Sequence, residues 1–127
     1  MTIEQGFLWF AELVMLVALG CFVQAFRVRK TDNALHQKLG KSGALLVIVG
    51  LVAVEVLLRG LGWRFPVRDA TTLHVHITVA SFALAVLLAL AFTGMKGPRS
   101  VHVKLYVLFF PLYLATIVTS VLAFRLW

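Results

Sequence analysis

The chain has 127 residues, of which 61% are hydrophobic and 13% are charged, and its mean hydropathy is +0.98. Because a soluble domain carries about 25% charged residues, this composition excludes a water-soluble surface, and lipid is the expected solvent. The net charge of +7 therefore indicates loops at lipid headgroups, and no nucleic-acid partner is expected. Residues 1–5 lack a basic region, so we expect no cleavable signal peptide.

Four apolar segments are each long enough to cross the bilayer, which takes about 20 residues in a helix. The sequence predicts helices at about residues 5–26, 34–61, 70–94 and 98–127. Asp69 is a good N-cap for the third helix, Pro98 suits the first turn of the fourth, and Pro111 should kink the fourth. Short connections favour antiparallel neighbours. The predicted fold is all-α: an integral membrane four-helix up-down bundle that forms a single domain over residues 1–127.

Lysine and arginine are unevenly distributed over the loops, with eight on the side of the first and third loops and four on the opposite side. The positive-inside rule therefore predicts a multi-pass protein of the bacterial cytoplasmic membrane with both termini in the periplasm. Trp9, Trp63 and Trp127 all fall on the outer side, as in an aromatic belt. The eight are Arg27, Arg29, Lys30, Lys38, Lys41, Lys96, Arg99 and Lys104, and the four are Arg59, Arg64, Arg68 and Arg125.

The pattern His-x-Lys-Leu occurs twice, with His36 and Lys38 at the start of the second predicted helix and His102 and Lys104 at the start of the fourth. In an up-down ring these helices are diagonal, so the two imidazoles could face each other across the bundle axis. That geometry suits axial ligation of haem b iron, or part of a copper or iron site, with the lysines meeting haem propionates. The alternative is that the histidines are interfacial polar residues and the lysines are orientation signals.

A second polar layer is expected near the outer ends of the spans. Glu12, Glu55 and His76 come from three helices at similar depth, and carboxylates with imidazole bind metal ions or carry protons. A shared metal would remove the repulsion between two buried carboxylates. His74 is a further candidate ligand, but residues two apart on a helix cannot face one site, and His76 shares a face with Asp69. The alternative is that each carboxyl group is neutral, hydrogen-bonded and structural.

Three stretches of the chain resemble the small four-helix bacterial membrane proteins of the CtaM/YozB type. They are FRVRKTDNALHQKL with His36, LHVHITVA with His76, and VHVKLYVLFFPLYLATIVTS with His102. Members of that family are tied to the maturation of haem-copper terminal oxidases. The chain departs from the family pattern at two points, since Glu55 is the ionisable residue nearest to a missing histidine and Ser120 replaces a glycine. The resemblance implies a site that keeps His36, His76 and His102.

The function expected from these patterns is that of a haem- or metal-binding assembly or accessory factor for a respiratory haem-copper oxidase, acting by protein contact rather than turnover. Its expected partners are the lipid bilayer and a respiratory membrane complex, and a homo-oligomer is an option. One alternative is a b-type bis-histidine cytochrome that takes electrons from quinol, although only one clear histidine pair is present. Others are a cofactor-free structural subunit and, on the strength of Glu12 alone, a small proton-coupled exporter.

Overall fold

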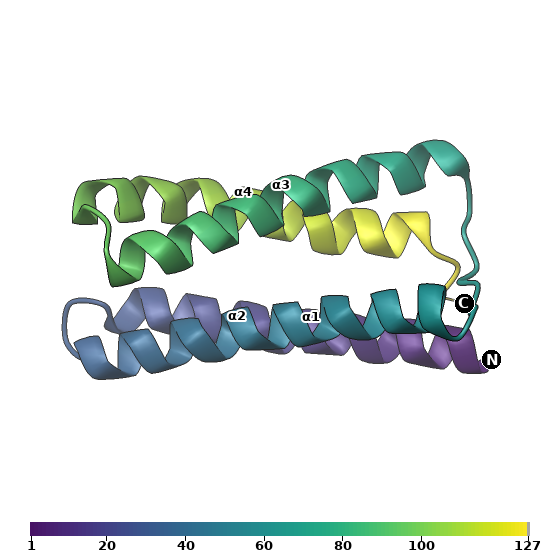
Figure 1. Cartoon of the computed structure of the whole chain (residues 1–127), viewed down its shortest axis with the longest axis horizontal. Coiled ribbons are helices and arrows are strands. Elements are labelled where there is room, and N and C mark those ends of the chain that lie inside the picture. The colour runs from purple at the N-terminus through teal and green to yellow at the C-terminus, as the bar shows by residue number, and fades with distance from the viewer. Residues whose placement is uncertain (127) are drawn as a thin grey trace. The chain divides into compact units, whose positions relative to one another are not determined.

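The structure is a computed structural model that describes residues 1–126, so Trp127, predicted in the outer aromatic belt and at the end of the fourth helix, lies outside the described residues. The helices are α1 (Ile3–Val28), α2 (Asn33–Glu55), α3 (Ala70–Met95) and α4 (Arg99–Ala123), and a π-helical turn, η1 (Val56–Gly60), continues α2 (Figure 1). Each span, α2 with η1 counted as one, is long and apolar enough to cross a membrane. The predicted all-α class with four long apolar helices is confirmed.

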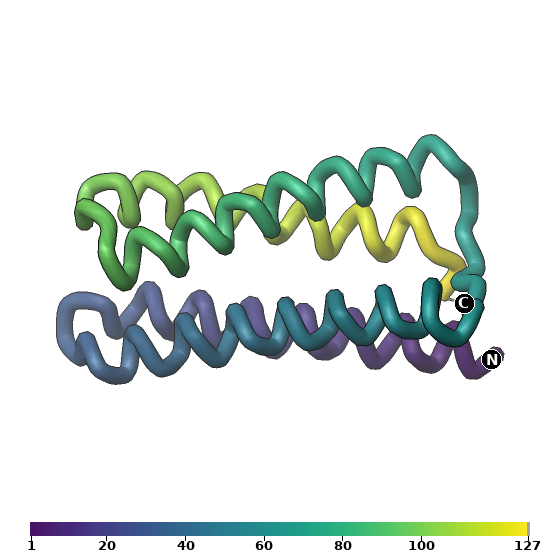
Figure 2. The backbone as a smooth tube through the Cα atoms, in the orientation of Figure 1, coloured from purple at the N-terminus to yellow at the C-terminus, as the bar shows by residue number. Residues whose placement is uncertain are grey.

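The chain divides into two compact units, each of which is an antiparallel helical hairpin. The first unit comprises residues 1–66 with Leu126, and in it α1 packs against α2. The second unit comprises residues 67–125, and in it α3 packs against α4. Figure 2 shows how the backbone turns tightly through residues 29–32 in the first unit and 96–98 in the second. Consecutive helices are thus antiparallel neighbours within each unit, as the short loops predict.

The starts of three helices follow from the residues that precede them. Asp32 accepts a hydrogen bond from the Leu35 amide at 3.0 Å, and Asp69 accepts one from the Thr72 amide at 2.7 Å. Both carboxylates satisfy a backbone donor that the first helical turn leaves without a partner, as N-caps do. The predicted cap at Asp69 is confirmed, whereas Pro98 is the N-cap residue of α4 and not part of its first turn.

The fourth helix ends at Ala123, before the predicted end at residue 127. Phe124 is already extended, with φ −102° and ψ 150°, and the Arg68 amide donates to the Ala123 carbonyl at 2.8 Å. Carbonyls in the last turn of a helix have no partner within the helix. The carbonyl of Ala123 therefore accepts from the Arg68 amide, which lies in the segment before α3. In the first unit, the Trp9 indole N–H donates to the Leu126 carbonyl at 2.7 Å. The last residues are therefore held by side chains and backbone that lie far away in the sequence.

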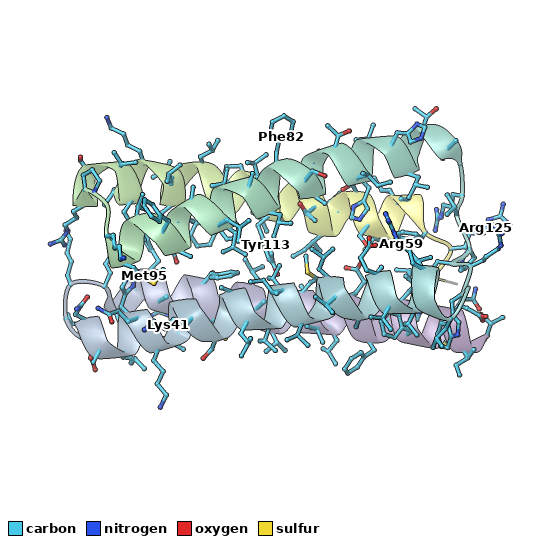
Figure 3. The ribbon with its side chains drawn as sticks, viewed as in Figure 1. Lys41, Arg59, Phe82, Met95, Tyr113 and Arg125 are labelled. Carbon is cyan, nitrogen blue, oxygen red and sulfur yellow. The ribbon has the colours of Figure 1, made fainter. Side chains whose placement is uncertain are left out.

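A buried glycine allows α1 and α2 to approach closely. A Cβ at Gly43 would lie 2.7 Å from Cε1 of Phe22, which is itself buried. Small residues permit close contact between helices, and Gly43 does so here, whereas a Cβ at Gly40 would meet nothing within 4 Å. Large apolar side chains cover the outside of the helices, and Figure 3 shows Phe82, which is 62% exposed, projecting outward from α3. Such surfaces are suited to contact with lipid.

Candidate functional site

The two histidines of the His-x-Lys-Leu repeat occupy the same position in their helices. His36 is the fourth residue of α2 and His102 is the fourth residue of α4. Their backbone amides close the first turn onto the N-cap carbonyls of Asp32, at 2.9 Å, and Pro98, at 3.2 Å. Both imidazoles are half-buried, whereas the side chains of the lysines two residues later are exposed. The repeat therefore has a common local structure in both hairpins.

His36 is bonded across the first hairpin to the end of α1. Its Nδ1 lies 2.7 Å from the carbonyl oxygen of Ala25. Ala25 is the fourth residue from the end of α1, and the carbonyls of the last four residues of a helix lack intrahelical partners. Because a carbonyl can only accept, Nδ1 carries the proton. This hydrogen bond both satisfies an orphan acceptor and fixes the orientation of the ring.

His102 is bonded across the second hairpin to the end of α3. Its Nδ1 lies 3.1 Å from the Leu90 carbonyl and 3.1 Å from the Thr93 hydroxyl oxygen. The Thr93 hydroxyl donates its own proton to the carbonyls of Ala89, at 2.9 Å, and Leu90, at 3.2 Å. The oxygen of Thr93 is thus left to accept from the imidazole. The contact with the Leu90 carbonyl requires the proton of His102 to be on Nδ1, and the Thr93 oxygen then accepts from the same N–H.

The location of the proton decides which ring nitrogen can act as a ligand. A neutral imidazole with its proton on Nδ1 has its lone pair on Nε2, and the hydrogen bond made by one nitrogen sets the state of the other. Histidines that bind metals almost always donate their second ring N–H to a carbonyl, a carboxylate or water. His36 and His102 both meet this condition. They have the chemistry of preorganised imidazole ligands for haem iron or for copper.

His76 is held by the same arrangement at the opposite end of the α3–α4 hairpin. Its Nδ1 lies 3.0 Å from the Thr119 hydroxyl oxygen. Thr119 donates its proton to the carbonyls of Ala115, at 2.7 Å, and Thr116, at 3.2 Å. The Thr119 oxygen therefore accepts from Nδ1–H. His76 also meets the ring of Phe124 edge-on at 5.8 Å.

Sequence reasoning identified the histidines but missed the threonines that hold them. The signal is a short repeat, ALAFT at residues 89–93 and ATIVT at residues 115–119, in which alanine precedes threonine by four residues. Each copy lies in the last turns of a helix, opposite a histidine in the first two turns of its partner. Thr93 is followed by glycine and Thr119 by serine, so a small residue comes next in both cases.

The other residues of the predicted outer layer have different surroundings. Glu12 is buried in α1, whereas Glu55 is largely exposed and forms an ion pair with Arg59 of the next turn, Nε to Oε2, at 2.8 Å. The carboxylate of Glu55 thus has a cation from its own span. His74 is exposed on α3 while His76 is half-buried, so the two histidines face different surroundings, as expected from their spacing. The predicted convergence of Glu12, Glu55 and His76 stays a prediction.

Two further observations concern the kind of protein to which this site belongs. Among residues 1–126, no three side chains of histidine, cysteine, aspartate or glutamate form a group that could hold a metal ion. No protein-family model matches the chain, and neither a curated protein nor a solved structure is significantly similar to it.

Proposed function

We propose that the protein is a small multi-pass membrane protein that binds haem b or a metal ion through His36 and His102. The observation that carries the proposal is the pair of equivalent hydrogen bonds from Nδ1 of these histidines to carbonyls of the preceding helices, at 2.7 Å and 3.1 Å. In both, the geometry puts the lone pair on Nε2, the nitrogen that would ligate. Each hairpin thus contributes one imidazole of fixed tautomer.

Haem b is the cofactor that requires the fewest ligands from the protein. The porphyrin supplies the equatorial nitrogens, so the iron needs only axial ligands from side chains, and two imidazoles are a common pair. Lys38 and Lys104 follow the histidines by two residues and are exposed, so they are proposed to pair with the propionates. A copper or iron ion bound by the same imidazoles is the second form of the proposal, because imidazole suits these metals as well.

We further propose an accessory or assembly role for a respiratory haem-copper oxidase, in the bacterial cytoplasmic membrane. The similarity of the three histidine-bearing stretches to the CtaM/YozB type supports this role. In the proposed orientation, the loops at residues 29–32 and 96–98 face the cytoplasm and both termini face the periplasm, because eight of the twelve lysines and arginines lie in these loops or in the helix ends beside them. The protein would act by binding and by contact with oxidase subunits in the bilayer.

The test is cofactor binding by the purified full chain in detergent, first with haemin and separately with Cu²⁺. We expect the unaltered chain to give a Soret band with haemin or a stoichiometric complex with copper. His36→Ala and His102→Ala should each lower the binding affinity at least tenfold, because loss of a ligand's hydrogen-bond partner alone already lowers affinity by about that factor. Gln37→Ala, a change of an exposed neighbour of His36, is the matched control and should bind as the unaltered chain does. Binding of neither probe, or equal binding by all variants, contradicts the proposal.

A hairpin-stabilising role for His36 is separated from ligation in the same experiment. The bond to the Ala25 carbonyl alone predicts that His36→Ala lowers the unfolding temperature in detergent without changing any cofactor spectrum. Ligation predicts that added haemin or Cu²⁺ raises the unfolding temperature of the unaltered chain and not that of the variant. The comparison of the two melting curves, with and without the probe, distinguishes the roles.

A further inference from the structure

Positive charge is concentrated where α1 ends and α2 begins. Five of the twelve lysines and arginines of the chain lie within residues 27–41, and this stretch contains a single carboxylate, that of Asp32, so its formal charge is +4. Asp32 caps α2 by accepting from the Leu35 amide at 3.0 Å. We name residues 27–41 the basic turn, and its cations are Arg27, Arg29, Lys30, Lys38 and Lys41.

Only one of these five cations has a partner inside the protein. Arg29 donates from Nη1 to the Phe26 carbonyl at 2.6 Å, and its Cζ lies 3.7 Å from the centroid of the Phe26 ring. The other four side chains are exposed. Within residues 1–126, no side-chain hydrogen bond or ion pair is made by Arg27, Lys30, Lys38 or Lys41.

The other end of the same span has a different charge arrangement. There, Arg59 pairs with the carboxylate of Glu55 at 2.8 Å. In the part of the chain that the structure describes, no carboxylate pairs with the four exposed cations of the basic turn. Clusters of lysine and arginine next to a membrane span attract anionic headgroups. The negative charge that balances the basic turn is therefore expected to come from a ligand.

An exposed apolar surface begins beside two of these cations. Lys38 and Lys41 are three residues apart on α2, so their side chains are neighbours on one face of the helix. Because side chains lean toward the N-terminus of a helix, both ammonium groups are directed toward the basic turn. The same face continues at four, seven and eleven residues after Lys41. We name these three residues the apolar stripe: Leu45, Ile48 and Val52, with exposed fractions of 62%, 39% and 55%.

We propose that the first hairpin binds an anionic phospholipid, with its phosphate at Lys38 and Lys41 and an acyl chain along the apolar stripe. The ammonium groups supply point charges suited to a phosphate, and the stripe supplies the surface that an acyl chain covers. A free phosphate would use the cations alone, and a zwitterionic lipid would bring a cation of its own toward them.

This inference does not rest on the proposed function. A lipid phosphate and a haem propionate would share Lys38, whereas Lys41 has no part in the proposed haem site. The lipid site also does not depend on the side of the membrane on which the basic turn lies. Lys41 is therefore the residue that distinguishes the two proposals.

The test is native mass spectrometry of the full chain in detergent, with phosphatidylglycerol or phosphatidylcholine of identical acyl chains. We expect the chain to bind phosphatidylglycerol at least about tenfold more tightly. Lys41→Gln should weaken this binding about fivefold, and Lys38→Gln together with Lys41→Gln about thirtyfold, the usual effect of removing one or two cations beside an anionic lipid. Lys38→Arg with Lys41→Arg keeps both charges and should bind as the unaltered chain does.

A matched control removes the same charge from the second hairpin. Lys96 and Arg99 are exposed at the turn between α3 and α4, so Lys96→Gln with Arg99→Gln tests whether net charge alone matters. This pair should weaken phosphatidylglycerol binding less than about twofold, since it leaves the basic turn intact. Equal binding of the two lipids, or an equal loss from the two pairs of substitutions, would overturn the proposal.

Inorganic phosphate distinguishes a lipid site from a phosphate site. Added at the concentration of the lipid, it should not displace phosphatidylglycerol, because it makes no contact with the apolar stripe. Displacement would identify a site for free phosphate and overturn the lipid proposal. The proposed function is read separately, by titrating Lys41→Gln with haemin, which should bind as it does to the unaltered chain. Loss of lipid binding and loss of haemin binding are thus seen in different measurements.

Discussion

His102 and Gly94 are in close contact across the α3–α4 turn, with a Cβ at Gly94 reaching 3.2 Å from Cε1 of the imidazole. The glycine therefore lets the ring lie against the α3 backbone while Nδ1 bonds to Thr93. We expect Gly94→Ala to displace the ring by a few tenths of an ångström and to weaken haemin binding about tenfold, the loss typical of a disturbed supporting contact. The measurement is a Soret titration, with Gly20→Ala, which meets nothing within 4 Å, as the control.

Gly43 should be essential for the stability of the first hairpin. A methyl group there would lie 2.7 Å from Cε1 of the buried Phe22, so either the ring or the helix must move. We expect Gly43→Ala to lower the free energy of unfolding by about 1–3 kcal/mol, the usual cost of overpacking. Gly40→Ala, on the same helix with open space, should change it little. Equal stability of the two variants in a detergent unfolding series would show that the close contact is absent.

The start of α3 should depend on pH through Asp69. Hydrogen bonds from the backbone amide and side chain of Thr72 lower the pKa of Asp69 below its ordinary value of 3.8. A lowered pKa means that the cap stabilises the helix fully above about pH 3.8 and loses that effect as the pH falls through the lower folded value. Amide hydrogen exchange at Thr72 and Leu73 should therefore speed up at acid pH relative to a mid-helix amide. Asp69→Asn keeps an acceptor and should abolish this pH dependence.

The proposed orientation is tested by cysteine labelling with a membrane-impermeant maleimide in a Cys21→Ser background. Thr31→Cys, Lys96→Cys and Arg64→Cys place the label at exposed positions in the first, third and second loops, respectively. We expect the Thr31 and Lys96 positions to react only in inside-out vesicles and the Arg64 position only in right-side-out vesicles. Gly97 is avoided because a Cβ there would lie 2.7 Å from Cα of Thr93. The reverse pattern would contradict the orientation.

The sequence was sufficient for the helices because hydrophobic length and capping chemistry are local properties. Apolar runs bounded by Asp69 or Pro98 predict the spans to within a few residues, and the cap at Asp69 is observed. The end of α4 was missed because it depends on the Arg68 amide and on the extended Phe124, which lie on segments more than 50 residues apart. A single-sequence pattern carries no information about such a non-local competition.

For the site, the sequence singled out the histidines as candidates, but it did not predict the hydrogen bonds that hold them. The repeat of His-x-Lys-Leu corresponds to a real structural equivalence, since His36 and His102 occupy the same helical position and both use Nδ1 to reach the preceding helix. Thr93 and Thr119 were missed because a threonine within an apolar span also bonds to its own backbone, and only the packed hairpin reveals the imidazole beside it. The ion pair of Glu55 with Arg59 was likewise overlooked, although the i, i+4 spacing was visible.

The axial ligation of bound haem is the most direct test of the central claim that His36 and His102 are ligands. The measurement is the electron paramagnetic resonance spectrum of the purified full chain with one equivalent of haemin, compared with those of His36→Ala, His102→Ala and Gln37→Ala. We predict a low-spin ferric signal typical of two imidazole ligands in the unaltered chain and in Gln37→Ala, and conversion to a high-spin signal in each histidine variant. An identical spectrum in all four proteins would contradict the account.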